Sequence, residues 1–332
     1  MCGTTALACP HLWAQIDIQT GAREQLISFL VEHGHPLPLS LCVREPRLFE
    51  PLPPHISEEF LDSVKRVLWQ HAVTLSHVVF SGSPAFLTHC LTIPKSGNGI
   101  LMIRVINTEA GRSGSWTTGI PGMSISDQSA MFARKNLDLR IVDLMGCTIP
   151  LTSPILSSPH LTCLFMNIPR GCEARQVHAM LQAAPQLRTI GLKLVTGLES
   201  PEATHFLPKI DSRHLEDLFL GGVNVAVLTV LEHFKFTRIG VRMTLFVGVL
   251  PTPGNSRRVG RRLFEVLGKT NLPSDDVNGA SDPNRVFSPH AFGINFTKGQ
   301  LGQGYNFYTQ CWGTSSNPTP PMNAAVWCYM TR

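Results

Sequence analysis

Apolar residues recur in a fixed phrase between residues 139 and 220. The phrase carries apolar residues at its first, fourth and sixth positions, and successive copies begin 22, 26 and 28 residues apart. Its four copies are Leu139-x-x-Val142-x-Leu144, Leu161-x-x-Leu164-x-Met166, Leu187-x-x-Ile190-x-Leu192 and Leu215-x-x-Leu218-x-Leu220. Residues two apart on a β-strand point to the same face. The fourth and sixth positions are therefore predicted to face a core, and the third, fifth and seventh to face out.

This phrase matches the leucine-rich repeat template, L-x-x-L-x-L-x-x-N/C-x-L. The first copy fills the template through Cys147 and Ile149, whereas the ninth position is Pro169, Val195 and Val223 in the other three. One such unit cannot bury its apolar face alone, so the copies stack. The sequence predicts an α/β fold, an irregular leucine-rich-repeat solenoid. Short parallel strands are expected on its concave side, with helices and loops on its convex side.

The alternative is that the phrase arises by chance or on amphipathic helices. Helix breakers lie between the copies, and they rule out one long helix through this region. These breakers are Pro159, Pro169, Pro185, Pro208 and the pair Gly221-Gly222. The regular spacing of the copies and the helix breakers between them together favour the repeat.

Looser signals extend the series to about nine strands. Alternating residues predict strands at 16–18 and 39–43, and three weaker copies of the phrase predict others. These are Leu75-x-x-Val78-x-Phe80, Ile100-x-x-Ile103-x-Val105 and Phe236-x-x-Ile239-x-Val241. Helical spacing predicts helices over 23–32, 57–68, 173–183 and 224–234. The Gly- and Ser-rich segment 107–129 is interpreted as an inserted loop.

Composition restricts the function classes. Hydrophobic residues make up 43% of the 332 residues, charged residues 15%, and the net charge is only +5, with basic residues scattered. Neither a nucleic-acid nor a membrane partner is implied. The nine cysteines form no C-x-x-C pair, which indicates thiols in a reducing compartment. With no secretory signal at the N-terminus and no apolar run long enough for a membrane span, a cytoplasmic or nuclear protein is expected.

No motif indicates an enzyme. The chain has no G-x-S-x-G elbow, H-E-x-x-H or P-loop, and Gly299-x-x-Gly302-x-Gly304 has the wrong spacing for a dinucleotide site. We expect no catalytic residues, no cofactor and no metal. A non-enzymatic recognition protein is the favoured class, a repeat scaffold is the second, and a hydrolase on an unrecognised α/β fold is a distant third.

The N-terminal stretch Ala6-Leu7-Ala8-Cys9-Pro10-His11-Leu12-Trp13-Ala14-Gln15-Ile16-Asp17 resembles a phrase of fungal F-box-like proteins with leucine-rich repeats. In that family the phrase follows the last F-box helix, and Leu37-Pro38-Leu39-Ser40-Leu41 is similar to its next element. The resemblance covers roughly residues 6–245 and implies a substrate receptor of a cullin-type (SCF) ubiquitin ligase. The F-box itself is missing before Ala6, so a Skp-type adaptor is an expected partner only if an F-box precedes this sequence.

The resemblance and the repeat pattern divide the chain into three regions. Residues 1–18 are interpreted as a remnant that follows an F-box and leads into the first strand. Residues 19–250 form the solenoid. Residues 251–332, rich in turn-forming residues, form an irregular C-terminal cap or tail that is partly disordered. The alternative is a leucine-rich-repeat scaffold or degenerate fragment with no ubiquitin-ligase role, and an in-frame F-box upstream would decide between the two.

The outward positions of the four strong copies predict a partner-binding site. The fifth positions are Asp143, Phe165, Gly191 and Phe219, with Lys193 at a seventh and Asp217 at a third. Two outward phenylalanines on one row, flanked by both charges, suit an interface with aromatic anchors. We therefore expect Asp143, Phe165, Lys193, Asp217 and Phe219 to contact an unknown client protein on the concave face. If the register slipped by one residue, or if the tail folded back, these rings would be covered.

Overall fold

The computed structural model of this chain divides into two compact units. Unit 1 comprises residues 1–114 and 121–167, and unit 2 comprises residues 115–120 and 168–332. The residues that the structure describes are 9–18, 24–35, 37–45, 60, 62–66, 74–91, 99–112, 123–125, 132, 138–194, 198, 207–235, 241–249, 261–262, 265, 291–298 and 305–312.

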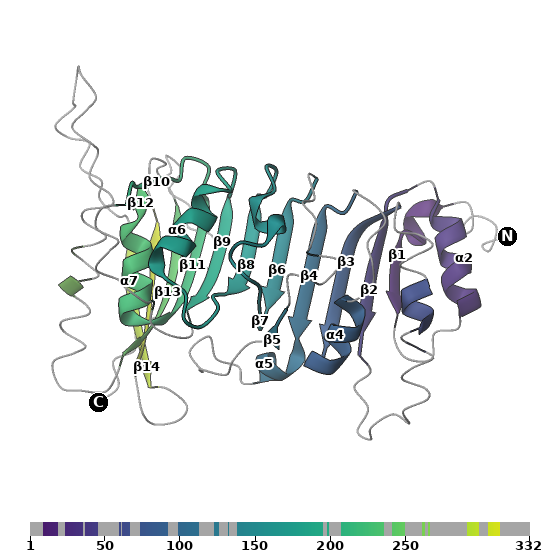
Figure 1. The fold of residues 1–332 in the computed structure, drawn as a ribbon, viewed down its shortest axis with the longest axis horizontal. Coiled ribbons are helices and arrows are strands. Elements are labelled where there is room, and N and C mark those ends of the chain that lie inside the picture. Colours follow the sequence, from purple (N-terminus) through teal and green to yellow (C-terminus); the bar gives the residue numbers. More distant parts are fainter. Residues whose placement is uncertain are drawn as a thin grey trace, which may run out of the picture. The chain divides into compact units, whose positions relative to one another are not determined.

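Unit 1 contains six parallel strands side by side (Figure 1). Their order in space follows the sequence, β1-β2-β3-β4-β6-β8. The strands are β1 (Gln15–Ile18), β2 (Leu39–Arg44), β3 (Leu75–Gly82), β4 (Met102–Asn107), β6 (Ile141–Met145) and β8 (Cys163–Asn167). Each connection is long enough for the crossover that parallel neighbours require. Unit 1 is therefore of the α/β class, as the sequence predicts.

The strand register aligns the predicted inward positions of unit 1. Ile16 pairs with Leu41, and this row of register partners continues across the sheet through Val78, Ile103, Val142 and Leu164. All six side chains are almost fully buried. The third, fifth and seventh positions lie on the opposite side of the sheet, here called the outward face. The predicted inward and outward assignment is confirmed for this unit.

Short elements cover the inward side of unit 1. They are η1 (Pro10–Leu12), α2 (Glu24–Gly34), α4 (Pro84–Leu91), α5 (Thr108–Arg112), η2 (Pro154–Ser157) and a small parallel pair, β5 (Met123–Ser124) with β7 (Cys147–Thr148). Helix α4 packs against β3 and β4 and buries Phe86, Leu87, Cys90 and Leu91. Residues 60 and 62–66 are also helical, within the predicted helix 57–68, and Phe60 and Val64 are buried.

Unit 2 contains three parallel strands extended by a hairpin. The order is β9-β11-β13-β15-β14, and the last two strands are antiparallel to their neighbours. The strands are β9 (Thr189–Leu194), β11 (Asp217–Val223), β13 (Arg242–Val249), β14 (Ala291–Lys298) and β15 (Tyr305–Trp312). Ile190, Leu218 and Met243 occupy one inward level, and all three are buried.

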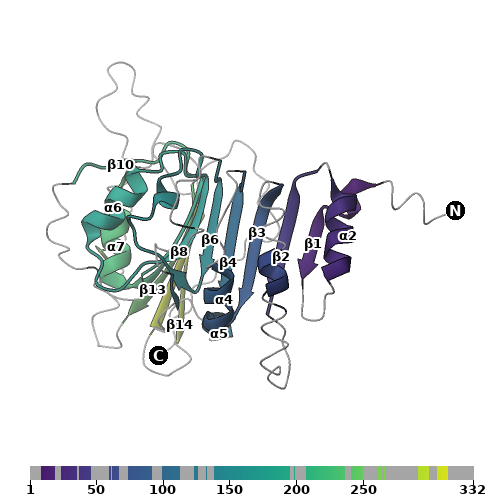
Figure 2. The same cartoon turned by 45° about the vertical axis from the view of Figure 1, so that its right-hand side comes forward.

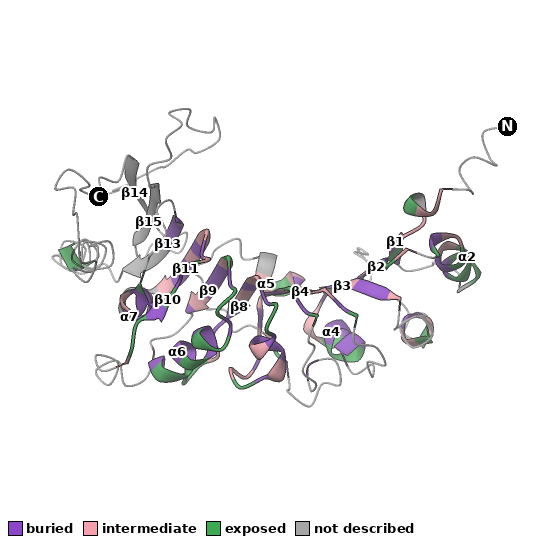
Figure 3. Ribbon diagram, turned by 90° about the horizontal axis from the view of Figure 1, so that it is seen from above, coloured by how far each residue is buried: buried purple, intermediate pink, exposed green. Residues whose placement is uncertain are grey.

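Two helices lie side by side in unit 2 (Figure 2). Helix α6 (Ala174–Gln182) begins with a capping box between Glu173 and Gln176. It buries Ala174, Val177, Met180 and Leu181 and exposes its other side to solvent (Figure 3). Helix α7 (Asn224–Glu232) packs against β11 and β13. A short parallel pair, β10 (Ile210–Asp211) with β12 (Phe234–Lys235), completes the unit.

Two sequence interpretations are wrong. The segment 107–129 is not a plain loop, because it contains α5 and β5. The copy that begins at Phe236 predicts Val241 as an inward strand residue, but β13 begins only at Arg242, and Met243 and Leu245 take the inward positions; residues 236–240 of this copy lie outside the described residues. The apolar run 239–250 allows several registers, and pairing with β11 selects one of them.

Candidate recognition surface

The outward face of unit 1 is centred on Asp143. Strand register places Arg104 on one side of Asp143 and Phe165 on the other. Arg104 Nε donates a hydrogen bond of 2.7 Å to Asp143 Oδ2. Although Asp143 occupies an outward position, it is only 6% exposed, whereas the Arg104 side chain is 43% exposed. Asp143 is therefore held within the protein by an ion pair rather than projecting freely from the sheet.

The environment of Asp143 shifts its titration. Burial raises the pKa of the Asp143 carboxyl above its ordinary value, and the hydrogen bond and charge of Arg104 oppose this rise without cancelling it. One carboxylate oxygen, Asp143 Oδ1, is buried and has no hydrogen-bond partner. A buried acceptor without a donor is costly. Only one of the two Asp143 carboxylate oxygens therefore accepts a hydrogen bond.

The outward face of unit 2 is centred on Phe219. Its register neighbours are small, because Gly191 lies on β9 and Thr244 on β13. Asp217 lies two residues before Phe219 on β11. Gly221 lies two residues after Phe219, and Lys193 on β9 pairs with it. The half-buried Phe219 ring therefore lies between an acidic and a basic residue. Burial lowers the pKa of the Lys193 ammonium.

The five predicted site residues thus form two groups. The structure brings Asp143 and Phe165 together in unit 1, and Lys193, Asp217 and Phe219 together in unit 2. The single row that would join Phe165 to Phe219 stays a prediction. Sequence reasoning missed Arg104, although a signal was present. Arg104 is the fifth residue of the looser copy that begins at Ile100, so it occupies the same outward position there as Asp143 does in its own copy.

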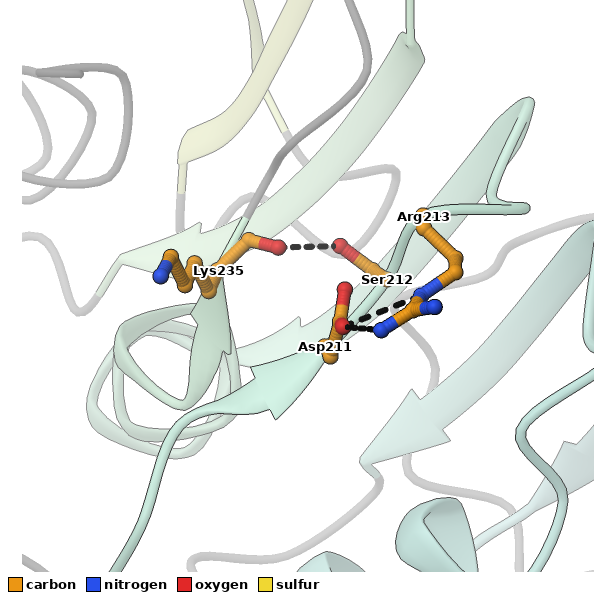
Figure 4. Close-up of polar contacts among 4 residues, drawn as sticks. All are labelled: Asp211, Ser212, Arg213 and Lys235. Carbon is orange, nitrogen blue, oxygen red and sulfur yellow. Dashed lines mark hydrogen bonds and ion pairs between the residues drawn. The ribbon is translucent and has the colours of Figure 1, made fainter. Parts of the chain in front are cut away.

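A second polar cluster lies at the short β10–β12 pair (Figure 4). Ser212 Oγ donates to the Lys235 carbonyl oxygen at 2.7 Å, and the Arg213 guanidinium donates to the Asp211 carboxylate. The hydrogen bonds from Arg213 lower the pKa of Asp211. The exposed Arg213 and Asp211 bind each other, and the buried Ser212 hydroxyl bonds to the backbone, so these groups stabilise the local structure rather than form a ligand site.

Buried titratable groups elsewhere are also explained by packing. The rings of His178 and His233 meet edge to face, with centroids 5.2 Å apart, and His178 Nε2 bonds to the Pro208 carbonyl oxygen. Burial raises the pKa of Cys90 and of Cys147 to about 12, which makes both thiols poor nucleophiles. Cys147 is a fully buried core residue. Cys163 is half-buried at an outward third position.

The described residues contain no group of three or more His, Cys, Asp or Glu side chains able to hold a metal ion. Within that same part of the chain, no helix is long and apolar enough to cross a membrane. Comparison with known proteins finds no family model, no curated protein and no solved structure that matches this chain.

Proposed function

We propose that this chain is an irregular leucine-rich-repeat solenoid that recognises a client protein with the outward faces of its two units. The observation that carries this proposal is the strict alternation of the strands. It directs half-buried phenylalanines, Phe165 and Phe219, to the face opposite the helices. Aromatic side chains that are not needed for the core, with acidic and basic residues beside them, are typical anchors of protein interfaces.

Each of the two units supports recognition with its own group of residues. In unit 1, Phe165 lies beside the Arg104–Asp143 pair, which supplies polar contacts next to an aromatic anchor. In unit 2, Phe219 stands between Asp217 and Lys193, so an aromatic anchor is again combined with charged neighbours. No catalytic chemistry is required of either group, and the proposal is therefore a non-enzymatic one.

The ubiquitin connection is part of the proposal and rests on the N-terminal resemblance alone. In this view the chain is related to the substrate receptors of SCF-type ligases, and the client is delivered for ubiquitination. The second candidate is a repeat scaffold without that role. Co-purification of a cullin and a Skp-type adaptor with the full-length gene product supports the first candidate, and their absence beside a bound client supports the second.

Paired affinity purification tests the recognition surface. The wild-type chain and the double variant Phe165→Ala, Phe219→Ala serve as baits in extracts of the source cells. Any protein retained only by the wild type is then purified and titrated calorimetrically. We expect the double variant to weaken binding at least tenfold, because hot-spot aromatics contribute about 2 kcal/mol or more each.

The matched control is Gln182→Ala, an exposed residue on helix α6 that should leave binding unchanged. Melting temperatures of all variants show whether the substitutions disturb the fold. If the double variant binds every partner as the wild type does, the surface assignment is wrong.

A further inference from the structure

Short and long side chains alternate around Asp143 on the outward face of unit 1. Its neighbours on the same face are Arg104 and Phe165 across the sheet, and Ile141 and Met145 two residues away along β6. All four are longer than aspartate, which explains why Asp143 is buried while Met145 is 50% exposed. The Asp143 carboxylate is therefore surrounded by four longer side chains, three of which are apolar. Together with Asn167, these residues are called the β6 patch.

Two polar atoms of the β6 patch are buried without a hydrogen-bond partner. One is the acceptor Asp143 Oδ1, and the other is the donor Asn167 Nδ2. Asn167 is the last residue of β8, two beyond Phe165, so the strand alternation places it on the same face. Asp143 and Asn167 are 6% and 5% exposed. Native proteins pair nearly all such atoms, so these two atoms indicate a ligand that supplies both an acceptor and a donor.

The charge of the patch selects among ligands. Arg104 already neutralises Asp143, so a lysine or arginine from a partner would approach Arg104 and would offer Asn167 Nδ2 no acceptor. A carboxylate or phosphate would face the Asp143 carboxylate. A purely apolar side chain would leave both buried atoms unpaired. A neutral group that carries one N–H donor and one carbonyl acceptor satisfies both.

We propose that the β6 patch binds the carboxamide of an asparagine or glutamine side chain of a partner protein. The carboxamide N–H donates to Asp143 Oδ1, and its carbonyl oxygen accepts from Asn167 Nδ2. Residues beside it in the partner are apolar and pack on Met145, Ile141 and Phe165. This inference rests on the proposed function and specifies the chemistry that the outward face of unit 1 recognises.

A displayed library of random twelve-residue peptides tests the proposal. The library is panned on the full chain and depleted on the Met145→Glu variant, which changes an exposed residue and should fold normally. Recovered peptides are synthesised and titrated by calorimetry. We expect them to share an asparagine or glutamine between apolar residues. Replacing that residue with alanine should weaken binding about tenfold or more, and so should Asp143→Ala, and the two losses should not add in the double mutant.

A polarity swap gives a sharper test. Changing the shared peptide asparagine to aspartate removes its N–H donor and should abolish binding to the wild type. The same peptide should regain much of its affinity for the Asp143→Asn variant, whose side-chain amide can donate to the new carboxylate. Asp62→Asn alters an exposed carboxylate outside the patch and should change neither titration. Circular dichroism melts establish that each variant is folded.

Several outcomes overturn the proposal. A lysine or arginine consensus contradicts the charge argument. Peptides unaffected by Asp143→Ala and Met145→Glu place the contact elsewhere, and a library without patch-dependent sequences shows that the unpaired atoms have only a structural role. If binding depends on Phe219 but not on the β6 patch, the recognition function stands and this inference fails. If binding depends on neither, both fail.

Discussion

Leu218 and Phe219 are adjacent on β11 but face opposite ways, so alanine at each position tests the assignment of faces. Leu218 is fully buried between Ile190 and Met243, its register neighbours on β9 and β13. Truncation leaves a cavity in a packed core and should cost about 2–5 kcal/mol. For a unit of this size, that loss lowers the melting temperature by roughly 4–20 °C.

Phe219→Ala is the matched variant. Phe219 is half-buried on the outward face and has Gly191 and Thr244 as register neighbours, so its removal opens no cavity in the core. The expected loss is about 1 kcal/mol or less, despite the larger side chain removed. Thermal melts followed by circular dichroism measure both variants under one set of conditions. Equal shifts, or a larger shift for Phe219→Ala, would refute the register of β11 and the recognition surface built on it.

Three further predictions concern other residues. Burial raises the folded-state pKa of the Asp143 carboxyl. The stability that its protonated form contributes is therefore complete below the unfolded-state pKa and is lost as pH rises through the folded-state pKa. Over that interval Asp143→Asn should gain stability relative to the wild type. Denaturation at several acid pH values measures this, and a pH-independent difference contradicts it. Iodoacetamide at pH 8 should modify the half-buried Cys42 well before Cys147, whose pKa is about 12, and mass spectrometry gives the order. Gly222→Ala should lower the free energy of unfolding by about 1–3 kcal/mol or more. The reason is that φ of Gly222 is +143° and a Cβ atom there would lie 2.0 Å from the Leu194 carbonyl oxygen. An unchanged melting temperature would disprove the clash.

The sequence predicts the core better than it predicts the surface. Inward positions such as Val142 and Leu218 repeat with a period that burial imposes, and the structure aligns them level by level within each unit. The phrase predicts the inward positions of β13 four residues too early, because apolar residues continue at every odd position from 239 to 249 and only the neighbouring strand decides which of them pair. A local pattern cannot supply that information.

The C-terminal hairpin and the Asp143 pair were missed for different reasons. In β14, Phe292, Ile294 and Phe296 alternate as a strand requires, but turn-forming residues around them obscured the signal. The burial of Asp143 depends on the sizes of side chains from three strands, and its ion-pair partner Arg104 is 39 residues away in sequence. The outward position of Asp143 was readable from the phrase, whereas its burial and its unpaired oxygen required the structure.

Site-specific photocrosslinking to a purified client tests the recognition surface most directly. A benzophenone side chain is introduced singly at Phe165, at Phe219 and at Gln182, the last being exposed on helix α6. If the outward faces bind the client, irradiation should crosslink it from positions 165 and 219 and not from position 182. Crosslinks from position 182 alone would place the client on the helical side and contradict the account.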